Sequence, residues 1–255
     1  MDVEGLRRLK GIRKVAMLTA YDYQMAKILD AAGVDIILVG DSLGMIVLGY
    51  GDTKSVTMED MVRHTGAVAQ GTKSALVVSD MPIDTYNNAE DAVKNAGKLI
   101  RVGADAVKLE GYNPEVIDAL TSSGIPVMGH VGLLPQTAER YRVRGKSREE
   151  AERIMSDAAA LDKHGVFSMV LESIPLGLAR LVTGSVGAVT IGIGAGIHCD
   201  GQVLVINDML GMDTSFKPKH VKRYACLDEA IREATNKFIE DVRKGRFPDD
   251  AHSFH

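Results

Sequence analysis

The hydrophobic pattern of the chain consists of short apolar runs separated by segments of helical periodicity. Most of these runs are nearly continuous in Val, Ile, Leu and Met, rather than alternating with polar residues. Continuous apolar strands are typical of parallel sheets covered by helices. The pattern therefore predicts eight parallel strands, at 15–20, 35–41, 75–81, 106–111, 125–132, 167–173, 188–196 and 202–208.

The segments between these runs carry helix start and stop signals. Thr57 and Ser147 each stand three residues before an acidic residue, and Asn88 opens another helical pattern. Hydroxyl and amide side chains at such positions cap helix N-termini. Gly103 and Gly165 follow helical runs, where glycine commonly ends a helix.

Strand and helix alternating eight times most economically closes into a (β/α)₈ barrel, the TIM-barrel fold. A doubly wound open sheet is the competing architecture, and connection handedness does not separate the two. Without a linker-like stretch or a composition break, the sequence predicts a single barrel domain over 1–255. An extra C-terminal amphipathic helix is expected to end near Gly245, followed by a flexible tail at 249–255.

Polar side chains appear where the predicted strands end. In a parallel barrel these ends converge on one rim, the face that carries the chemistry of such folds. Lys108 and Glu110 lie two positions apart, so their side chains share a face and are expected to point into the barrel mouth. The full set of strand-end residues is Asp41 and Ser42, Asp80, Lys108 and Glu110, His130, and Glu172 and Ser173.

Three carboxylates that converge in a water-poor mouth repel one another unless a cation lies between them. Oxygen ligands favour a hard divalent ion, Mg²⁺ before Mn²⁺, over zinc. We therefore predict a metal site formed by Asp41, Asp80 and Glu110, with substrate and water completing the coordination. Lys108 would neutralise a substrate carboxylate or a developing oxyanion. Glu172, outside the metal set, is free to act as a general base.

The same residues also allow less specific interpretations. A lone acid at a strand end more often caps a helix or pairs with a basic side chain, but five successive strands ending in ionisable groups favour an enzyme site. His130 is either a substrate contact or a residue that orients another side chain. The glycine-rich stretch 190–196 either cradles a phosphate at the last barrel loops or simply makes a tight strand-to-loop passage, since it lacks a GxGxxG pattern.

Composition limits the classes of partner and the cellular location that we expect. The formal net charge is −4, which gives no basic field, so we expect neither a nucleic-acid nor a membrane partner. Cys199 and Cys226 show no CxxC spacing, which excludes a disulfide framework and a thiolate zinc site. Since the sequence contains neither a long apolar run nor a signal-peptide core, we expect a cytoplasmic protein.

Six ordered motifs resemble the ketopantoate hydroxymethyltransferase (3-methyl-2-oxobutanoate hydroxymethyltransferase) family, from about residue 3 to Pro248. They are "MLTAYD" (17–22), "LVGDSLG" (38–44), "VKLEG" (107–111), "GHVGLLPQ" (129–136), "VLESIP" (170–175) and "TIGIGAGIHCDGQVLV" (190–205). The resemblance implies transfer of a hydroxymethyl group from 5,10-methylenetetrahydrofolate to 3-methyl-2-oxobutanoate, giving 2-dehydropantoate in pantothenate synthesis. It also implies a homodecamer and a barrel with a metal site of the phosphoenolpyruvate/pyruvate type at its C-terminal rim.

The resemblance assigns roles to the strand-end residues. It implies one Mg²⁺ per subunit, on the three carboxylates selected above. Contacts with the oxo acid fall on Asp41, Ser42, Asp80 and Lys108, and the proton acceptor is Glu172. His130 is added as a candidate substrate contact from its position alone.

One segment departs from the family pattern. The stretch 135–147 is shorter than usual, lacks a Gly-Gly pair before Tyr141 and is rich in arginine. It is expected at the rim of the site, so the placement of the folate and the identity of the pterin donor stay open.

Two alternative functions remain: a Mg²⁺-dependent 2-oxo acid lyase or phosphonomutase of the isocitrate-lyase type, and a non-catalytic metabolite-binding barrel. Lyases of the isocitrate-lyase type use a cysteine-containing motif near the middle of the chain, and the corresponding segment here, 127–136, contains no cysteine.

Overall fold

The computed structural model describes residues 1–213 and 218–255 of the chain. These residues form two compact units, Met1–Val205 and Ile206–His255. All the strands that the structure describes belong to the first unit.

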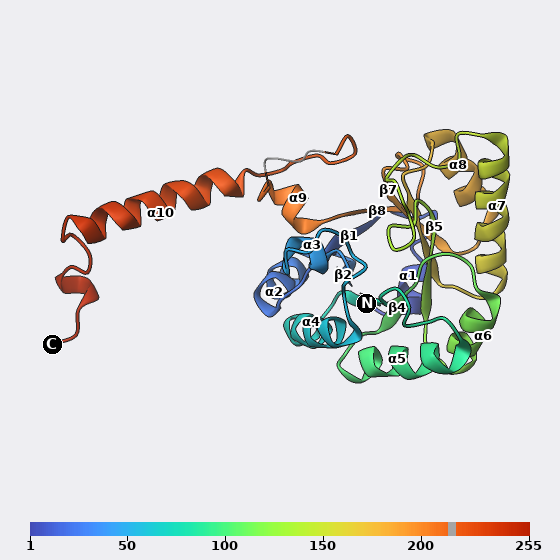
Figure 1. Cartoon of the computed structure of the whole chain (residues 1–255), viewed down its shortest axis with the longest axis horizontal. Helices are drawn as coiled ribbons and strands as arrows, with labels where there is room; N and C mark the ends of the chain where they lie inside the picture. The colour runs from blue at the N-terminus through green and yellow to red at the C-terminus, as the bar shows by residue number, and fades with distance from the viewer. Residues whose placement is uncertain (214–217) are drawn as a thin grey trace. The chain divides into compact units, whose positions relative to one another are not determined.

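In the described residues, eight parallel strands close into a barrel in sequence order, and the last strand pairs with the first (Figure 1). The strands are β1 (Val15–Thr19), β2 (Ile36–Val39), β3 (Leu76–Asp80), β4 (Ala106–Lys108), β5 (Val127–Gly132), β6 (Ser168–Glu172), β7 (Val189–Ile193) and β8 (Gly201–Leu204). The predicted parallel barrel is confirmed, and the open-sheet alternative is excluded because the β1–β8 pair leaves no edge.

Helices connect most of the strands and cover the outside of the barrel (Figure 1). In the first unit they are α1 (Val3–Arg7), α2 (Tyr23–Ala31), α3 (Leu43–Ile46), α4 (Met58–Gly71), α5 (Ala89–Arg101), α6 (Pro114–Ser122), α7 (Arg148–Lys163) and α8 (Leu176–Ser185). The predicted caps are confirmed: Thr57 and Asp60 form a reciprocal capping box on α4, and Asn88 and Ser147 accept backbone N–H groups at the starts of α5 and α7.

The ends of several strands and one connection differ from the sequence-based expectation. Strand β4 ends at Lys108 rather than at residue 111, and Gly111 turns the chain at φ +77°. Strand β8 ends at Leu204, because the apolar run continues into the short helix α9 (Ile206–Leu210). The described connection between β7 and β8 contains no helix, so strand and helix do not alternate eight times. Short apolar runs do not distinguish strand from helix by periodicity, which explains the error at 206–208.

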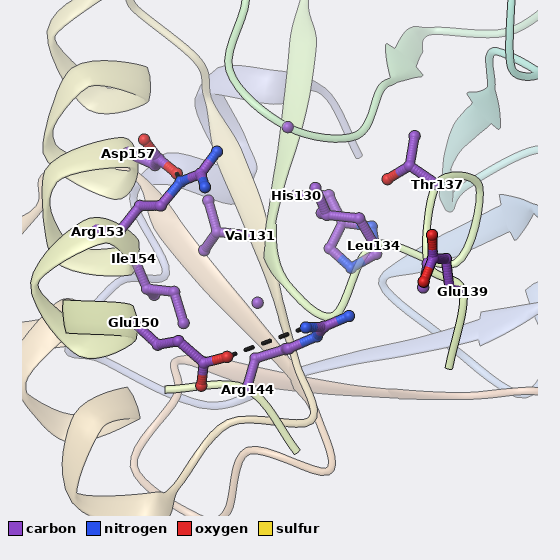
Figure 2. A pocket seen from close by; sticks show the side chains of 13 residues that line it. His130, Val131, Leu134, Thr137, Glu139, Arg144, Glu150, Arg153, Ile154 and Asp157 are labelled. Carbon is purple, nitrogen blue, oxygen red and sulfur yellow. Dashed lines mark ion pairs between the residues drawn. The ribbon is translucent and has the colours of Figure 1, made fainter. Parts of the chain in front are cut away.

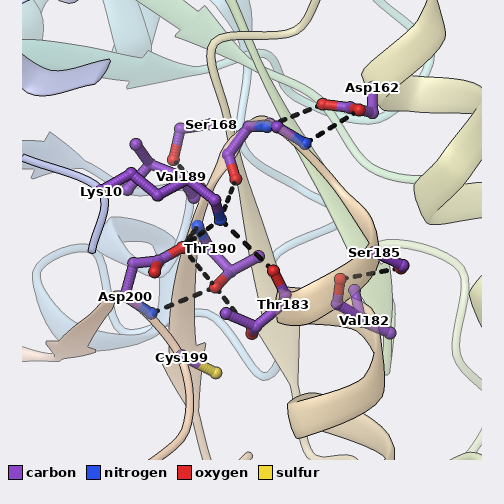
Figure 3. Close-up of polar contacts among 12 residues, drawn as sticks. Lys10, Asp162, Ser168, Val182, Thr183, Ser185, Val189, Thr190, Cys199 and Asp200 are labelled. Carbon is purple, nitrogen blue, oxygen red and sulfur yellow. Dashed lines mark hydrogen bonds and ion pairs between the residues drawn. The ribbon is translucent and has the colours of Figure 1, made fainter. Parts of the chain in front are cut away.

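The barrel interior is filled by apolar side chains and is closed at its N-terminal end. Leu6 of α1 is fully buried in the same hydrophobic cluster as Met17 and the other inward side chains of the strands. Next to it, the Lys10 ammonium donates to Asp200 Oδ2 at 2.6 Å and to the Ala188 carbonyl at 2.9 Å (Figure 3). Thr190 N also donates to Asp200 Oδ2, at 2.9 Å. The N-terminal end of the barrel is therefore closed by apolar packing and by hydrogen-bonded charges, and its role is structural.

The second unit contains α9, α10 (Leu227–Arg243) and a 3₁₀ turn, η1 (Asp250–His252). The predicted C-terminal helix is confirmed, and it ends just before Gly245, which has φ +65°. No residue of α10 is buried. Ile231, Phe238 and Val242, spaced by seven and four positions, are 50%, 56% and 47% exposed and share one face of the helix.

Candidate active site at the carboxyl ends of the strands

Strands β3 and β4 place a carboxylate and a lysine side by side at the barrel mouth. Asp80 and Lys108 are the last residues of their strands and lie opposite each other in the strand register. Their side chains are buried, and Lys108 Nζ donates to Asp80 Oδ1 at 2.6 Å. Asp41, two residues beyond β2, joins them because its backbone N–H donates to Asp80 Oδ2 at 3.0 Å.

The mouth holds more negative charge than this one lysine can neutralise. Burial, followed by repulsion from Asp80, raises the pKa of Asp41 to about 7. Burial also raises the pKa of Glu110 well above its usual value. Burial would lower the pKa of Lys108, but the charges of Asp80, Glu110 and Asp41 outweigh it and raise that pKa. The lysine therefore stays charged, while the carboxylates compete for protons or for a further cation.

His130 connects the carboxylates of Glu110 and Glu172. Its Nδ1 lies 3.5 Å from Glu110 Oε1, and its Nε2 lies 3.3 Å from Glu172 Oε2. Neither ring nitrogen makes a hydrogen bond of normal geometry among the described residues. The ring is buried, and burial lowers its pKa, which favours the neutral form. The Glu172 side chain is 20% exposed, compared with 3% for Glu110, so Glu172 is the acid that a substrate can reach.

The backbone after Glu172 is fixed by its neighbours. The Glu172 carbonyl accepts from Leu133 N at 2.9 Å, and Ser173 adopts the left-handed conformation, with φ +48°. Gly132 has φ +100°, and a Cβ there would lie 2.3 Å from the Glu172 carbonyl oxygen. Only glycine fits this close approach of β5 to β6. Arg144 N donates to the Ser173 carbonyl, so the segment 133–145 returns to β6 beside the candidate base.

Gln136 belongs to the site, although the sequence pattern did not single it out. Its amide Nε2 donates to Asp41 Oδ2 at 2.8 Å, and its backbone N–H donates to Glu110 Oε2 at 3.0 Å. The residue is 1% exposed. A neutral amide carries no charge signal, but its position in the "GHVGLLPQ" motif is one feature that could have indicated it.

Ser42 lies next to the carboxylate group. Its hydroxyl is 2.9 Å from the Tyr21 hydroxyl, and it makes no capping hydrogen bond to α3. A Cβ at Gly40 would lie 2.8 Å from Ser42 Oγ, so the glycine gives this hydroxyl room. The structure therefore brings all of the predicted strand-end residues to one rim of the barrel.

The donor set fits a divalent cation that also takes ligands from substrate and water. In residues 1–213 and 218–255, no three His, Cys, Asp or Glu side chains lie close enough together to hold a metal ion on their own. Mg²⁺ commonly binds one or two carboxylates and fills its octahedron with water and substrate oxygens. Asp41 and Asp80 offer such a pair, and their surplus charge favours a cation. The full set with Glu110 stays a prediction.

A cavity of about 400 Å³ opens beside this mouth, between the end of β5 and α7 (Figure 2). Val131, Leu134 and Ile154 give it an apolar wall. The arginines of the segment 135–147 are partly neutralised, since Arg142 and Arg144 both approach the carboxylate of Glu150. Tyr141 is 59% exposed, and its pKa is raised by partial burial and by the negative charges of nearby acids that include Asp52 and Glu172. The segment therefore lies at the rim, as expected.

The sequence profile of the ketopantoate hydroxymethyltransferase family matches residues 1–250. The chain belongs to the ketopantoate hydroxymethyltransferase family. The 3-methyl-2-oxobutanoate hydroxymethyltransferase of Syntrophus aciditrophicus is 51% identical over 259 residues, which cover 99% of this chain and 94% of that protein. The enzyme of the same name from Moorella thermoacetica is 53% identical over 248 residues, covering 94% of this chain and 92% of that protein. The resemblance seen in the motifs is confirmed.

Solved structures outside the ketopantoate hydroxymethyltransferase family share the fold. Phosphonopyruvate hydrolase, solved as a complex with oxalate and Mg²⁺, matches with a TM-score of 0.66 and 15% identity over 100% of this chain and 92% of that chain. For 2,3-dimethylmalate lyase the TM-score is 0.62 and the identity 17%, over 99% and 91% of the two chains. In the part of the chain that the structure describes, no helix has the length and apolar character needed to cross a bilayer.

Proposed function

We propose that this chain transfers a hydroxymethyl group from 5,10-methylenetetrahydrofolate to 3-methyl-2-oxobutanoate, giving 2-dehydropantoate for pantothenate synthesis. Relatives with 51% and 53% identity over nearly the whole chain are named for hydroxymethyl transfer to this oxo acid. The structural observation that carries most weight is the position of His130. Its ring nitrogens lie within 3.5 Å of both Glu110 and Glu172, so the proposed base shares one mouth with the proposed metal ligands.

Asp41, Asp80 and Glu110 would hold one Mg²⁺ per subunit. When bound, the ion would polarise the keto and carboxylate oxygens of the oxo acid and make the hydrogen on C3 more acidic. Lys108, charged and buried, would donate to the negative oxygen that develops as this proton leaves. Ser42 would donate its hydroxyl hydrogen to the oxo acid.

Glu172 would take the proton from C3. Neutral His130 carries one N–H, so it can donate to only one of its two carboxylate neighbours. With the hydrogen on Nε2, the ring would donate to Glu172 and orient this carboxylate. As the C3 carbanion forms the new carbon–carbon bond with the methylene carbon of the folate, the bond from that carbon to one folate nitrogen would break, and this nitrogen would take up the proton held by Glu172. One water molecule would then replace the bond to the second nitrogen, giving its hydroxyl to the product and its proton to that nitrogen, which releases 2-dehydropantoate and tetrahydrofolate. We place the folate over the segment 135–147 and the cavity beside β5.

Exchange of the C3 hydrogen into deuterated water tests this assignment without the folate. Wild-type protein with Mg²⁺ should exchange the C3 hydrogen of 3-methyl-2-oxobutanoate, as followed by proton NMR. Glu172→Gln should abolish the exchange while leaving binding of the oxo acid nearly intact, because only the proton acceptor is lost. Glu152→Gln, at an exposed acid on α7, is the matched control and should exchange at the wild-type rate. Persistent exchange in Glu172→Gln would remove this residue from the role.

The same assay separates the rival activities. A lyase or phosphonomutase of the isocitrate-lyase type should leave the C3 hydrogen of this oxo acid in place, and a non-catalytic barrel should bind without exchange. The likeness to 2,3-dimethylmalate lyase, at 17% identity, concerns the fold. An assay with Mg²⁺, 3-methyl-2-oxobutanoate and methylenetetrahydrofolate, with 2-dehydropantoate detected by mass, tests the complete reaction and the choice of pterin donor.

The exposed apolar face of α10 supports assembly with further copies of the chain. A helix whose Ile231, Phe238 and Val242 are all about half exposed needs a partner to bury them. We propose that this face packs on a second copy within a homo-oligomer, with the decamer as the expected size. Sedimentation velocity measures that size. The predicted cytoplasmic location also stays a prediction, which cell fractionation can test.

A further inference from the structure

Gln136 connects two carboxylates that come from different strands. Its side-chain amide uses both hydrogens of Nε2, one toward Asp41 Oδ2 at 2.8 Å and one toward the Met81 carbonyl at 2.9 Å. Its Oε1 accepts from the Tyr86 hydroxyl. Its backbone N–H donates to Glu110 Oε2 at 3.0 Å. The loop after β5 is thereby bonded to residues that follow β2, β3 and β4.

This network allows only one orientation of the amide. Nε2 faces two oxygen acceptors, and Oε1 faces a hydroxyl donor. Rotating the amide by half a turn would point Oε1 at the Asp41 carboxylate and leave the Met81 carbonyl without its donor. Both changes are costly at a residue that is 1% exposed, because buried polar groups need partners. The orientation of Gln136 is therefore a fixed feature of the site.

The hydrogen bonds of Gln136 leave one oxygen of each carboxylate available. Asp41 Oδ2 and Glu110 Oε2 accept from Gln136, whereas Asp41 Oδ1 and Glu110 Oε1 accept no hydrogen bond from the described residues. A donor on one carboxylate oxygen orients the group and directs the other oxygen toward a ligand. Gln136 does this for two carboxylates at once, one through its side chain and one through its backbone.

We propose that Gln136 is a positioning residue that aims the free oxygens of Asp41 and Glu110 at a single divalent cation. The inference rests on the proposed function, since it concerns the metal site of that reaction. In this role Gln136 would act through the two acids and not by direct contact with substrate or metal. Tyr86 supports it by fixing Oε1, and Tyr86 also accepts from Glu110 N at 3.4 Å.

Binding of Mn²⁺ to the substrate-free protein, measured by electron paramagnetic resonance, tests the proposal directly. Gln136→Met keeps the length of the side chain, removes its hydrogen bonds and retains the backbone N–H. We expect its Mn²⁺ dissociation constant to rise about 10-fold to 100-fold, the range typical of lost partners of metal ligands. Gln202→Met, which removes one side-chain bond to the Gly196 carbonyl, is the matched control and should stay within about twofold of wild type.

A second measurement separates positioning from general damage. The Mg²⁺ concentration for half-maximal C3–H exchange should rise in Gln136→Met by a similar factor, while the rate at saturating Mg²⁺ changes less. Partial unfolding would instead lower the rate without moving the half-saturating concentration, and that result would overturn the proposal. If Gln136→Met does not fold, Tyr86→Phe takes its place, with an expected rise of about threefold to tenfold in the dissociation constant.

The outcomes distinguish this inference from the function on which it rests. If wild-type protein binds one Mn²⁺ and the folded variants bind it equally well, the role of Gln136 is wrong and the proposed function stands. If wild-type protein binds no Mn²⁺ and exchange proceeds without a divalent ion, both the metal assignment and the inference fail.

Discussion

Replacing Lys108 would leave a group of buried carboxylates without their cation. The Lys108 side chain is 5% exposed, and its ammonium is 2.6 Å from Asp80 Oδ1. Lys108→Met keeps a similar length and apolar stem, so little of its effect would come from a cavity. The variant therefore isolates the electrostatic contribution of the lysine to the barrel mouth.

The expected cost follows from the burial of the pair. Removing one partner of a buried ion pair typically lowers the free energy of unfolding by about 3–5 kcal/mol. For a chain of this size, that corresponds to a fall in melting temperature of roughly 6–20 °C. The loss should grow with pH, because the folded variant raises the pKa values of its acids and binds more protons than the unfolded chain does. It should therefore be larger at pH 8 than at pH 6.

Urea unfolding with EDTA, repeated in excess Mg²⁺, measures this effect. A divalent cation bound only to the folded state at about 100 times its dissociation constant adds about 2.7 kcal/mol, so Mg²⁺ should restore much of the lost stability. Lys27→Met, at an exposed position on α2, is the matched control and should change the free energy of unfolding by less than about 0.5 kcal/mol. A loss below about 1 kcal/mol for Lys108→Met at pH 8 would refute the account of the charged mouth.

Three further predictions concern other parts of the chain. Arg13 holds Asp35 through two hydrogen bonds, of 2.6 and 2.8 Å, and lowers its pKa, so Asp35→Asn should cost about 2 kcal/mol at pH 7. Urea titrations should show this difference shrinking as the pH falls below the ordinary Asp value of about 3.9, and a difference that stays constant as the pH falls through the acid range would contradict it. Gly132→Ala, with its Cβ 2.3 Å from the Glu172 carbonyl, should slow C3–H exchange about 100-fold, unlike Gly124→Ala, which has a similar φ but open space; equal rates would contradict the close-approach argument. Phe238→Asp on α10 should reduce the assembly size in sedimentation velocity, and an unchanged size would exclude this face as a contact.

Much of the fold could be predicted because its cause lies in local sequence. The near-continuous apolar runs indicate strands covered by helices, and Thr57, Asn88 and Ser147 mark helix starts through bonds to residues three positions away. The missing helix between β7 and β8 could not be predicted, because a glycine-rich stretch is compatible with many connections. The run at 202–208 was ambiguous for a similar reason, since strand and helix both tolerate a short apolar segment.

The residues of the candidate site could be predicted where they are charged and stand at the ends of predicted strands. Asp80, Lys108 and Glu172 stand at strand ends, and strand register alone brings Asp80 and Lys108 together. The charge pattern could not indicate Gln136, because a neutral amide is common on any surface and its hydrogen bond to Asp41 spans 95 positions. The bridging position of His130 also depends on distances between β4, β5 and β6 that only the folded barrel fixes.

In the proposed reaction, the ends of β2, β3 and β4 would hold one divalent cation beside the base on β6. Anomalous diffraction from crystals soaked in Mn²⁺ and 3-methyl-2-oxobutanoate measures this directly. We expect a single strong peak per chain, about 2.0–2.2 Å from oxygens of Asp41 and Asp80 and within the reach of Glu110, with the oxo acid bound to the same ion. A peak elsewhere in the chain, or no peak when the oxo acid occupies the mouth, would contradict it.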